Sequence, residues 1–393
     1  MKPQEAGRVT EDMLRQLQSG CVDMLEALRH PSAAERAKRM VKALLGRSGA
    51  GESDPLFWPA GFLLLGLVES AAAGVHFEEN PAGKAGAWFA DWLRKDGRIR
   101  HVDDALAGVA ALGLCRMRAA ADGETYYREE ASATREAACR TFRFLQKAPK
   151  DAAGSLIYHP SEQNRCVYAD GTGMTAMFLS SYAAFRDPLT GEGLPDAEAA
   201  REMARIQLAN YMMHGMDAST GLPYHGYCLL ENGMVEKRGL VGWGRATGFL
   251  MMGFAAYLTA FEDAKLRDRF FGLKDDALAF QRQDGLFSWQ LPAAEGHVDT
   301  SASAMIGWAL RTAGRSELLP ADADRLQTDC AVGRMEGGLL SRMKDGRMED
   351  ALAECVDFAQ HPQRYGVYPW GMGAALLFFT EGIFAGKESD NHV

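Results

Sequence analysis

Six stretches of this chain have the composition of helices that are apolar on almost every side. They are rich in Gly, Ala, Leu, Met and Phe, carry few charges, and each follows a short polar or aromatic entry. The entries lie at Trp58, Asp103–Asp104, Asp170, Trp243, His297–Ser301 and Trp370. A helix that is apolar all round is stable only where protein covers every side of it. The chain must therefore bury six helices at once.

Helical segments of ordinary amphipathic pattern alternate with these stretches. They cover 11–30, 34–45, 82–95, 124–146, 196–213, 265–283 and 320–333. Alternation of buried and half-buried helices predicts an inner ring inside an outer ring, an all-α (α/α)6 barrel or six-hairpin toroid. An open α-solenoid is the alternative, although its repeats are shorter and more regular in length. We expect residues 1–393 to form a single domain, with loose tails at 1–10 and 386–393.

The composition excludes several classes of function. The 393 residues carry a formal net charge of −9, whereas a nucleic-acid partner would need a basic face. No run of 18 apolar residues occurs, and the polar N-terminus lacks the apolar core of a secretory signal, so we expect no membrane association. The seven cysteines, Cys166 and Cys228 among them, are scattered singly. This pattern predicts buried thiols in a reducing compartment, the cytoplasm.

The entries to the six apolar stretches are expected to meet in space. In such a ring all inner helices run the same way, so their N-terminal ends converge at one mouth. The mouth would then hold Trp58, Asp103 or Asp104, Asp170, Trp243 with Arg245, His297 with Asp299 and Thr300, and Trp370. Aromatic faces and carboxylates suit a sugar ring, and helix N-termini favour an anionic group. The mouth therefore predicts a site for an acidic sugar.

Asp170 is the strongest candidate for a catalytic acid. It lies in Val-Tyr-Ala-Asp170-Gly-Thr-Gly-Met, between apolar residues at the opening of a buried helix. An apolar surrounding raises the pKa of a carboxyl group, as a general acid requires. Asp103, Asp104 and Asp299 stand where N-cap residues belong, and capping alone would explain them.

Several other residues at the mouth could have either a structural or a substrate-binding role. Trp243 and Trp370 are either core aromatics or platforms for a sugar. Arg245 stands in an otherwise uncharged helix start and needs a partner, either a buried Asp or a substrate carboxylate. His225 lies in a glycine-rich stretch that we expect to form a loop over the mouth. The scattered histidines show no metal-ligand spacing, so we expect no metal and no cofactor.

Three stretches resemble the unsaturated uronyl hydrolases of glycoside hydrolase families 88 and 105. They are the Asp170 stretch given above, His225-Gly followed by Trp243-Gly-Arg245-Ala-Thr-Gly-Phe, and Asp284-Gly-Leu-Phe followed by His297-Val-Asp-Thr300-Ser-Ala. Their order and spacing hold over about residues 55–385. The resemblance implies a six-hairpin barrel, in agreement with the helix pattern.

The resemblance also implies a reaction. These enzymes act on oligosaccharides that polysaccharide lyases leave with a terminal 4,5-unsaturated uronic acid, and they include glucuronyl and rhamnogalacturonyl hydrolases. An Asp protonates C4 of the enol ether, water adds at C5, and the hemiketal collapses with loss of the aglycone. By resemblance the acid is Asp170, and the second carboxylate is Asp103 or Asp104, with Asp103 favoured. The expected substrate contacts are Asp104, His225, Trp243, Arg245, Thr247, His297, Thr300, Trp58 and Trp370.

This chain departs from the family pattern near the expected pocket. Arg245 is commonly followed by Gly-Asn-Gly-Trp but here by Ala246-Thr247-Gly248-Phe249, and Tyr227 replaces the usual tryptophan. An inverting glycosidase acting on a saturated uronide or a neutral sugar is therefore an alternative, and so is a non-catalytic carbohydrate-binding ring. We expect a monomer or homodimer.

Overall fold

The computed structural model describes most of the chain. The described residues are 9–30, 54–75, 80–117, 127–159, 165–316, 318, 322–356, 358 and 360–390, without the side chains of 127–131, 322–323 and 384–390. The helix expected at 34–45 and most of the N-terminal tail lie outside them. α13 continues to Asp390 and so includes part of the stretch expected as a C-terminal tail.

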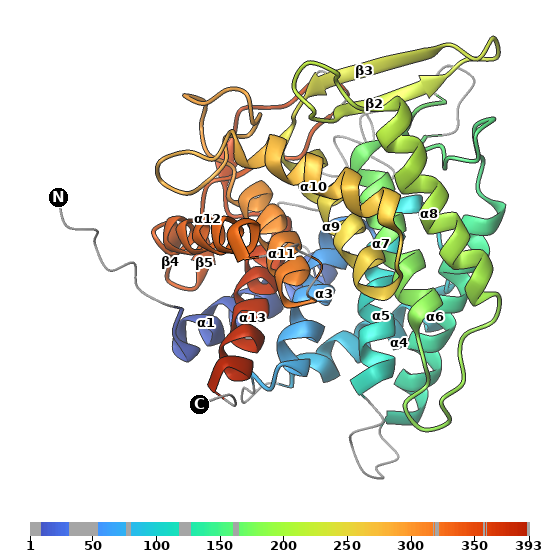
Figure 1. Ribbon diagram of the computed structural model, residues 1–393. Coiled ribbons are helices and arrows are strands. Elements are labelled where there is room, and N and C mark those ends of the chain that lie inside the picture. Colours follow the sequence, from blue (N-terminus) through green and yellow to red (C-terminus); the bar gives the residue numbers. More distant parts are fainter. Residues whose placement is uncertain are drawn as a thin grey trace, which may run out of the picture.

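Six helices form the inner ring, and they begin at or next to the predicted entries. They are α3 (Trp58–Ala72), α5 (Ala105–Met117), α7 (Ala169–Ala184), α9 (Gly244–Ala260), α11 (Thr300–Arg315) and α13 (Pro369–Asp390). Each packs against the next, and α13 packs against α3, so the ring closes (Figure 1). Closure rules out the open solenoid and confirms the toroid. Small residues permit this packing: a Cβ on Gly173 of α7 would lie 2.1 Å from the carbonyl oxygen of Phe249 in α9.

The outer helices cover the ring from outside. They are α1 (Glu11–Arg29), α4 (Pro81–Lys95), α6 (Tyr127–Lys147), α8 (Ala197–His214), α10 (Ala264–Leu278) and α12 (Asp322–Leu340). α4, α6, α8, α10 and α12 pack on α3, α5, α7, α9 and α11 respectively, and α1 packs on α3 and α13. The amphipathic pattern therefore predicted this layer correctly wherever the structure describes it.

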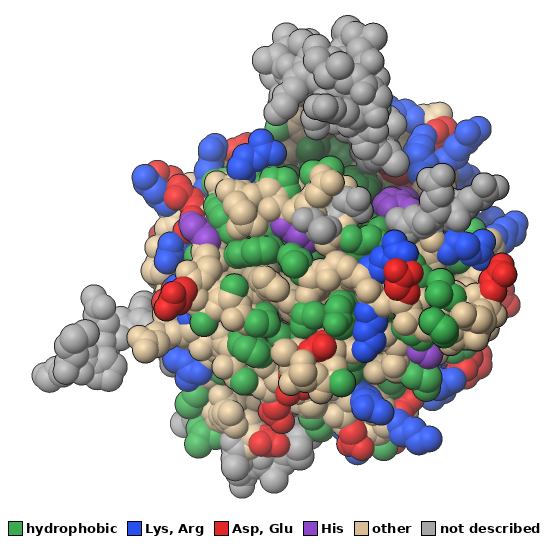
Figure 2. All heavy atoms as spheres, turned by 90° about the horizontal axis from the view of Figure 1, so that it is seen from above, with side chains coloured by type: hydrophobic (Ala, Val, Ile, Leu, Met, Phe, Trp, Pro, Cys, Tyr) green, Lys and Arg blue, Asp and Glu red, His purple; other side chains and the backbone are tan. Residues whose placement is uncertain are grey.

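Short strands stand at the end of the ring where the inner helices begin. β1 (Val167–Tyr168), β2 (Tyr224–Leu229) and β3 (Val235–Val241) form an antiparallel sheet in that order. Two small ribbons pair β4 (Met343–Lys344) with β5 (Arg347–Met348), and β6 (Ala351–Leu352) with β7 (Tyr365–Gly366). Figure 2 looks down on this face, whose centre is mostly hydrophobic side chains and backbone, with histidines among them. We call this end of the ring the mouth.

The stretch around His225 is a strand, not the loop expected from its glycines. Tyr224, Tyr227 and Leu229 are residue types that favour strands, and β2 pairs with β1 on one side and β3 on the other. This pairing fixes His225 against the mouth, because β1 leads directly into α7.

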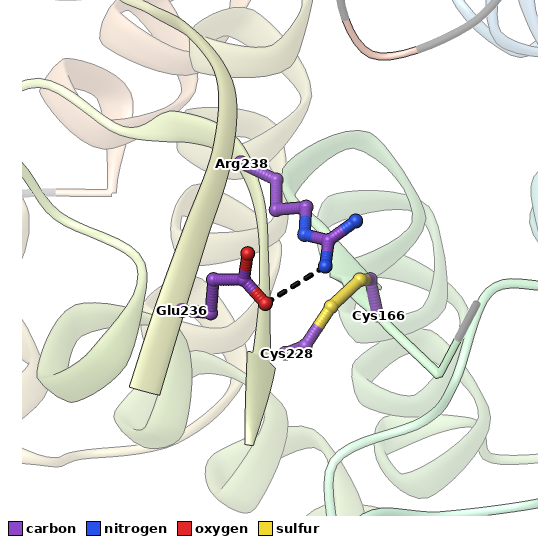
Figure 3. Close-up of a disulfide and its surroundings, with 4 residues drawn as sticks. All are labelled: Cys166, Cys228, Glu236 and Arg238. Atoms are coloured by element: carbon purple, nitrogen blue, oxygen red, sulfur yellow. Dashed lines mark hydrogen bonds and ion pairs between the residues drawn. A yellow bond between two sulfur atoms is a disulfide. The ribbon is translucent and has the colours of Figure 1, made fainter. Parts of the chain in front are cut away.

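A disulfide joins Cys166 and Cys228 across β1 and β2, next to the Glu236–Arg238 ion pair of β3 (Figure 3). Their Cα atoms lie 4.3 Å apart, at the position that follows the Val167–Tyr227 pair in the ladder. The expectation that every cysteine is a free thiol is therefore wrong for this pair. Single cysteines 62 residues apart gave no sign of pairing, because the strands that bring them together were not predicted. Within the described residues, no helix has the length and apolar character needed to cross a membrane.

Candidate active site

The aromatic entries of the first and last inner helices meet at the mouth. The ring centroids of Trp58 and Trp370 are 4.8 Å apart, and Trp370 stacks on Tyr368 at 4.7 Å. Both tryptophans are more than nine-tenths buried. Trp370 donates its indole N–H to the carbonyl of Leu352. The two rings therefore form one aromatic wall of the mouth, as the predicted convergence required.

Asp170 is the second residue of α7 and lies at the centre of the mouth. Its side chain is buried, and its Oδ1 accepts a hydrogen bond of 3.0 Å from the Gly171 N–H. Nε2 of His225 is 4.0 Å from its Oδ2. Burial, followed by the nearby charge of Asp103, raises the pKa of Asp170 to about 7, against the smaller opposing effects of Gly171 and Arg245. Asp170 is thus a carboxyl group that can hold a proton near neutral pH.

Asp103 is the second carboxyl group of the site. It lies in the 3-10 turn η2 (Val102–Asp104) and is fully buried. The Tyr158 hydroxyl donates to its Oδ2, which is 3.3 Å from Nδ1 of His101. Its Oδ1 has no hydrogen-bond partner among the described residues. Asp103 and Asp170 are therefore two buried acids that act on each other's charge and have no arginine or lysine bound to them among the described residues, although His101 contacts Asp103.

Asp104 points elsewhere. Its Oδ2 accepts the backbone N–H groups of Arg100 and His101, at 2.8 and 3.4 Å, and closes a capping box with His101. Burial and the charge of Asp54 raise its pKa well above the usual value. Asp103 is thus a carboxyl group whose charge acts on Asp170, and Asp104 caps η2. Which of the two is the second catalytic carboxylate, and whether Asp104 contacts substrate, stay predictions.

Arg245 has a partner inside the protein. Its guanidinium donates to the carbonyl oxygens of Leu352 and Ala353, at 2.7 and 3.0 Å, and lies 3.6 Å from Oδ2 of Asp299. Only 1% of its surface is exposed. Of the two partners considered from the sequence, the structure supplies the buried Asp. Asp299 also caps α11 as expected, by accepting the Ser301 N–H.

Two threonines expected at the site use their hydroxyls within the fold. Thr247 donates to the carbonyl of Trp243 one helical turn earlier, and Thr300 donates to the carbonyl of Glu349. Both side chains are fully buried. Their sequence positions at helix starts suggested substrate contact, but a threonine hydroxyl in a helix commonly satisfies a backbone carbonyl instead.

His225 lies in an aromatic cluster that sequence reasoning had only partly found. Its ring packs on Trp243 at 4.5 Å and on Phe358 at 5.1 Å, and His361 packs on Trp243 at 4.7 Å. Burial lowers the pKa of His225 to about 3 and that of His361 to about 4, so both rings are neutral at neutral pH. No motif pointed to His361, because it stands in an irregular segment far from every helix start.

His297 is placed at the edge of the mouth. Its side chain is 45% exposed, stacks on Tyr365 at 3.8 Å, and lies 3.8 Å from Oδ1 of Asp350. None of these contacts is with the Asp103–Asp170 pair. A role in binding the reacting sugar is therefore less direct than the sequence suggested.

The residues that depart from the family pattern make contacts within the fold. Phe249 packs on Phe62 at 5.3 Å and on Trp58 of the mouth at 6.3 Å, and Ala246 is fully buried in α9. Tyr227 donates its hydroxyl to Ser155 and packs on Tyr211. That these substitutions line the pocket stays a prediction.

Solved structures of sugar-processing proteins share this fold. A possible member of the GH105 family from Klebsiella pneumoniae has a TM-score of 0.73 at 15% identity, covering 98% of this chain and 96% of that one. An unsaturated glucuronyl hydrolase from Bacillus sp. GL1 has a TM-score of 0.61 at 19% identity, covering 83% and 86%. An unsaturated glucuronyl hydrolase described as specific for heparin has a TM-score of 0.66 at 13% identity, covering 96% and 99%. No curated protein matches the chain significantly in sequence.

The family assignment rests on the sequence itself. The sequence model of Glycosyl Hydrolase Family 88 matches residues 37–384, which include the inner ring up to the last residues of α13 and also Asp103 and Asp170. The low identities to the solved structures show the fold alone, whereas the family match spans most of the chain. This chain is a member of glycosyl hydrolase family 88.

Proposed function

We propose that this chain removes a terminal 4,5-unsaturated uronic acid from oligosaccharides by hydration of the enol ether. The observation that carries the proposal is the buried Asp103–Asp170 pair, in which Asp170 has a pKa raised to about 7. Protonation of a carbon needs an acid that keeps its proton near neutral pH. Membership of the family supports a glycosidase, and the two solved glucuronyl hydrolases support the substrate class.

In the proposed reaction Asp170 donates its proton to C4 of the unsaturated sugar. The positive charge that develops at C5 is shared with the ring oxygen and is favoured by the carboxylate of Asp103. Water adds at C5 and returns its proton to Asp170, so the acid is regenerated. The resulting hemiketal opens to a ketone, and the hemiacetal at C1 then releases the aglycone as an alcohol.

Recognition of the sugar is proposed to come from the aromatic walls and neutral imidazoles. Trp58, Trp370 and Trp243 offer ring faces, and His225 can exchange hydrogen bonds with hydroxyl groups because it is uncharged. Arg245 acts through the electrostatic field of its positive charge, which lowers the pKa of Asp170 and of His225. Its own hydrogen bonds go to backbone carbonyls. This field also favours the carboxylate of the substrate.

Glucuronyl or rhamnogalacturonyl specificity, the monomer or homodimer and the cytoplasmic location stay predictions. The disulfide Cys166–Cys228 counts against the part of the cytoplasmic prediction that rested on free thiols.

The direct test is loss of the absorbance of lyase-generated unsaturated disaccharides from glycosaminoglycans and pectin. We expect turnover of at least one, and a fall of about 10²–10⁴-fold in Asp170→Asn, which removes the proton donor. The control Asp268→Asn changes an exposed residue of the outer helix α10 and should match the wild type.

A reaction in D₂O separates hydration from direct displacement. Hydration by a bound acid places one deuterium on a single face of C4, whereas direct displacement releases an unsaturated uronic acid whose spontaneous tautomerisation labels both faces of C4. Turnover of saturated substrates alone, or deuterium on both faces of C4, would favour the inverting glycosidase. Absence of turnover on all substrates would favour a binding ring.

A further inference from the structure

Tyr158 lies between the two acids of the site, and no sequence motif singled it out. Its hydroxyl donates to Oδ2 of Asp103. Its ring stacks on Tyr168 of β1 at 4.3 Å with an interplanar angle of 8°. Its backbone N–H donates to the carbonyl of Cys166 at 3.0 Å. The ring is therefore held from the side of β1, and the hydroxyl is aimed at Asp103.

The first turn of α7 is shaped around the same ring. A Cβ on Gly171 would lie 2.5 Å from Cδ2 of Tyr158, closer than side chains approach one another. Gly171 is also the residue whose N–H donates to Asp170. The ring of Tyr158 thus rests against the turn that carries Asp170 while its hydroxyl holds Asp103. One side chain therefore bonds Asp103 and packs against the turn that carries Asp170.

We propose that Tyr158 is a positioning residue that keeps Asp103 in its charged form, so that the proton of the pair resides on Asp170. A phenol hydroxyl donates to a carboxylate and stabilises its charged form. Among the described residues, Asp170 receives backbone N–H groups, that of Gly171 at its Oδ1 among them. The charge on Asp103 in turn favours the protonated form of Asp170.

His101 is a second group that distinguishes the two acids, because its ring lies 3.3 Å from Oδ2 of Asp103. The titratable or charged groups nearby are His101, Asp104, Tyr211, His225, Arg245 and Cys355. His225 has a pKa lowered to about 3 and the thiol of Cys355 a pKa raised to about 12, so neither changes charge between pH 5 and 8. Asp103, together with Asp104, raises the pKa of His101 against the lowering effect of burial. His101 is the group whose titration must be told apart from that of Asp103.

The test is Tyr158→Phe, which keeps the stacked ring and removes only the hydroxyl. Its kinetic part rests on the proposed function. We expect the acid limb of the pH profile of kcat/KM to move upward by about one to two pH units, because a charge-assisted hydrogen bond to Asp103 is lost. The alkaline limb, which reports loss of the proton from Asp170 in the proposed mechanism, should stay in place. Tyr182→Phe, on the buried tyrosine that stacks on Phe142, is the control and should move neither limb.

A uniform loss of rate with both limbs unmoved would overturn the proposal and make Tyr158 merely structural. A second measurement needs no substrate: titration of the ¹³C-labelled aspartate carboxyls by NMR in wild type and Tyr158→Phe, with Asp103→Asn and Asp170→Asn to assign the signals. The signal of Asp103 should titrate at higher pH in Tyr158→Phe. An unmoved Asp103 signal, or a shift confined to His101, would also overturn the proposal. If the protein does not hydrolyse unsaturated uronides, the kinetic measurement cannot be made. The NMR titration then decides alone whether Tyr158 keeps Asp103 charged.

Discussion

The mouth of the ring holds two clusters of buried charge. They differ in whether a buried arginine balances the negative charge of the carboxyl groups. In the first, Arg245 bonds two carbonyls and faces Asp299, whose Oδ1 accepts the N–H and hydroxyl of Ser301 and the N–H of Leu352. In the second, Asp103 and Asp170 have no arginine or lysine partner among the described residues, and the ring of His101 lies 3.3 Å from Asp103. One oxygen of Asp103 and one of Asp299 have no hydrogen-bond partner among those residues. Both clusters are buried at helix starts, but only in the first does a buried arginine balance the charge of the carboxylate.

This difference suggests a structural role for the cluster of Arg245 and Asp299 and a functional role for Asp103 and Asp170. A buried arginine that bonds backbone carbonyls and faces a buried carboxylate holds elements in place, here the start of α9, the start of α11 and the segment after β6. A buried pair of acids costs stability and persists in a fold where function requires it. The arginine, which by residue type is the obvious contact for an acidic sugar, belongs to the structural cluster.

The largest effect on stability is expected from Arg245→Met. It leaves Asp299 buried without its cation, so we expect the free energy of unfolding to fall by about 3–5 kcal/mol in denaturant titrations. The matched control is Arg205→Met, which breaks the exposed pair with Glu202 and should cost less than about 1 kcal/mol. Equal decreases in the free energy of unfolding of the two variants would show that Arg245 does not balance the charge of Asp299 as described.

Removal of the disulfide should have the next largest effect on stability. The local loosening should be confined to β1 and β2, near Asp170. It ties β1, which leads to Asp170, to β2, which carries His225. Closing a loop of 62 residues is worth up to about 4 kcal/mol in chain entropy, so Cys166→Ser with Cys228→Ser should lower the free energy of unfolding by up to that amount. Hydrogen exchange should rise in β1 and β2 and stay unchanged at Leu352 and Ala353. Cys330→Ser, at an exposed free cysteine, is the control.

The ring could be predicted from the sequence, whereas the partners within the mouth could not. Apolar helix faces repeat along the chain, so the six inner helices and their entries follow from local pattern alone. Whether Arg245 meets Asp299 or a ligand depends on how segments far apart in sequence pack, and so do the Cys166–Cys228 link and the contact of Tyr158 with Asp103. Tyr158 and His361 lie outside helices, where periodicity carries no signal.

The resemblance to a family predicted residue types better than residue roles. It predicted Asp170 and Asp103 in one site, and the fold brings together the helix starts at which both acids stand; their catalytic roles stay predictions. It assigned substrate contacts to Thr247 and Thr300, whose hydroxyls the structure gives to backbone carbonyls. A sequence motif specifies which residues are present, but their hydrogen-bond partners depend on the whole ring.

The most direct test of this account is the pH dependence of stability in wild type and Asp170→Asn. The folded protein raises the pKa of Asp170 from its ordinary value of 3.8 to about 7. A raised pKa favours folding at pH values below the ordinary one, and that stability is lost as the pH rises to about 7. Relative to Asp170→Asn, which does not titrate, the wild type should lose on the order of 2–4 kcal/mol of unfolding free energy between pH 4 and pH 8. Parallel curves for the two proteins would contradict a proton on Asp170 near neutral pH, and with it the acid at the centre of the site.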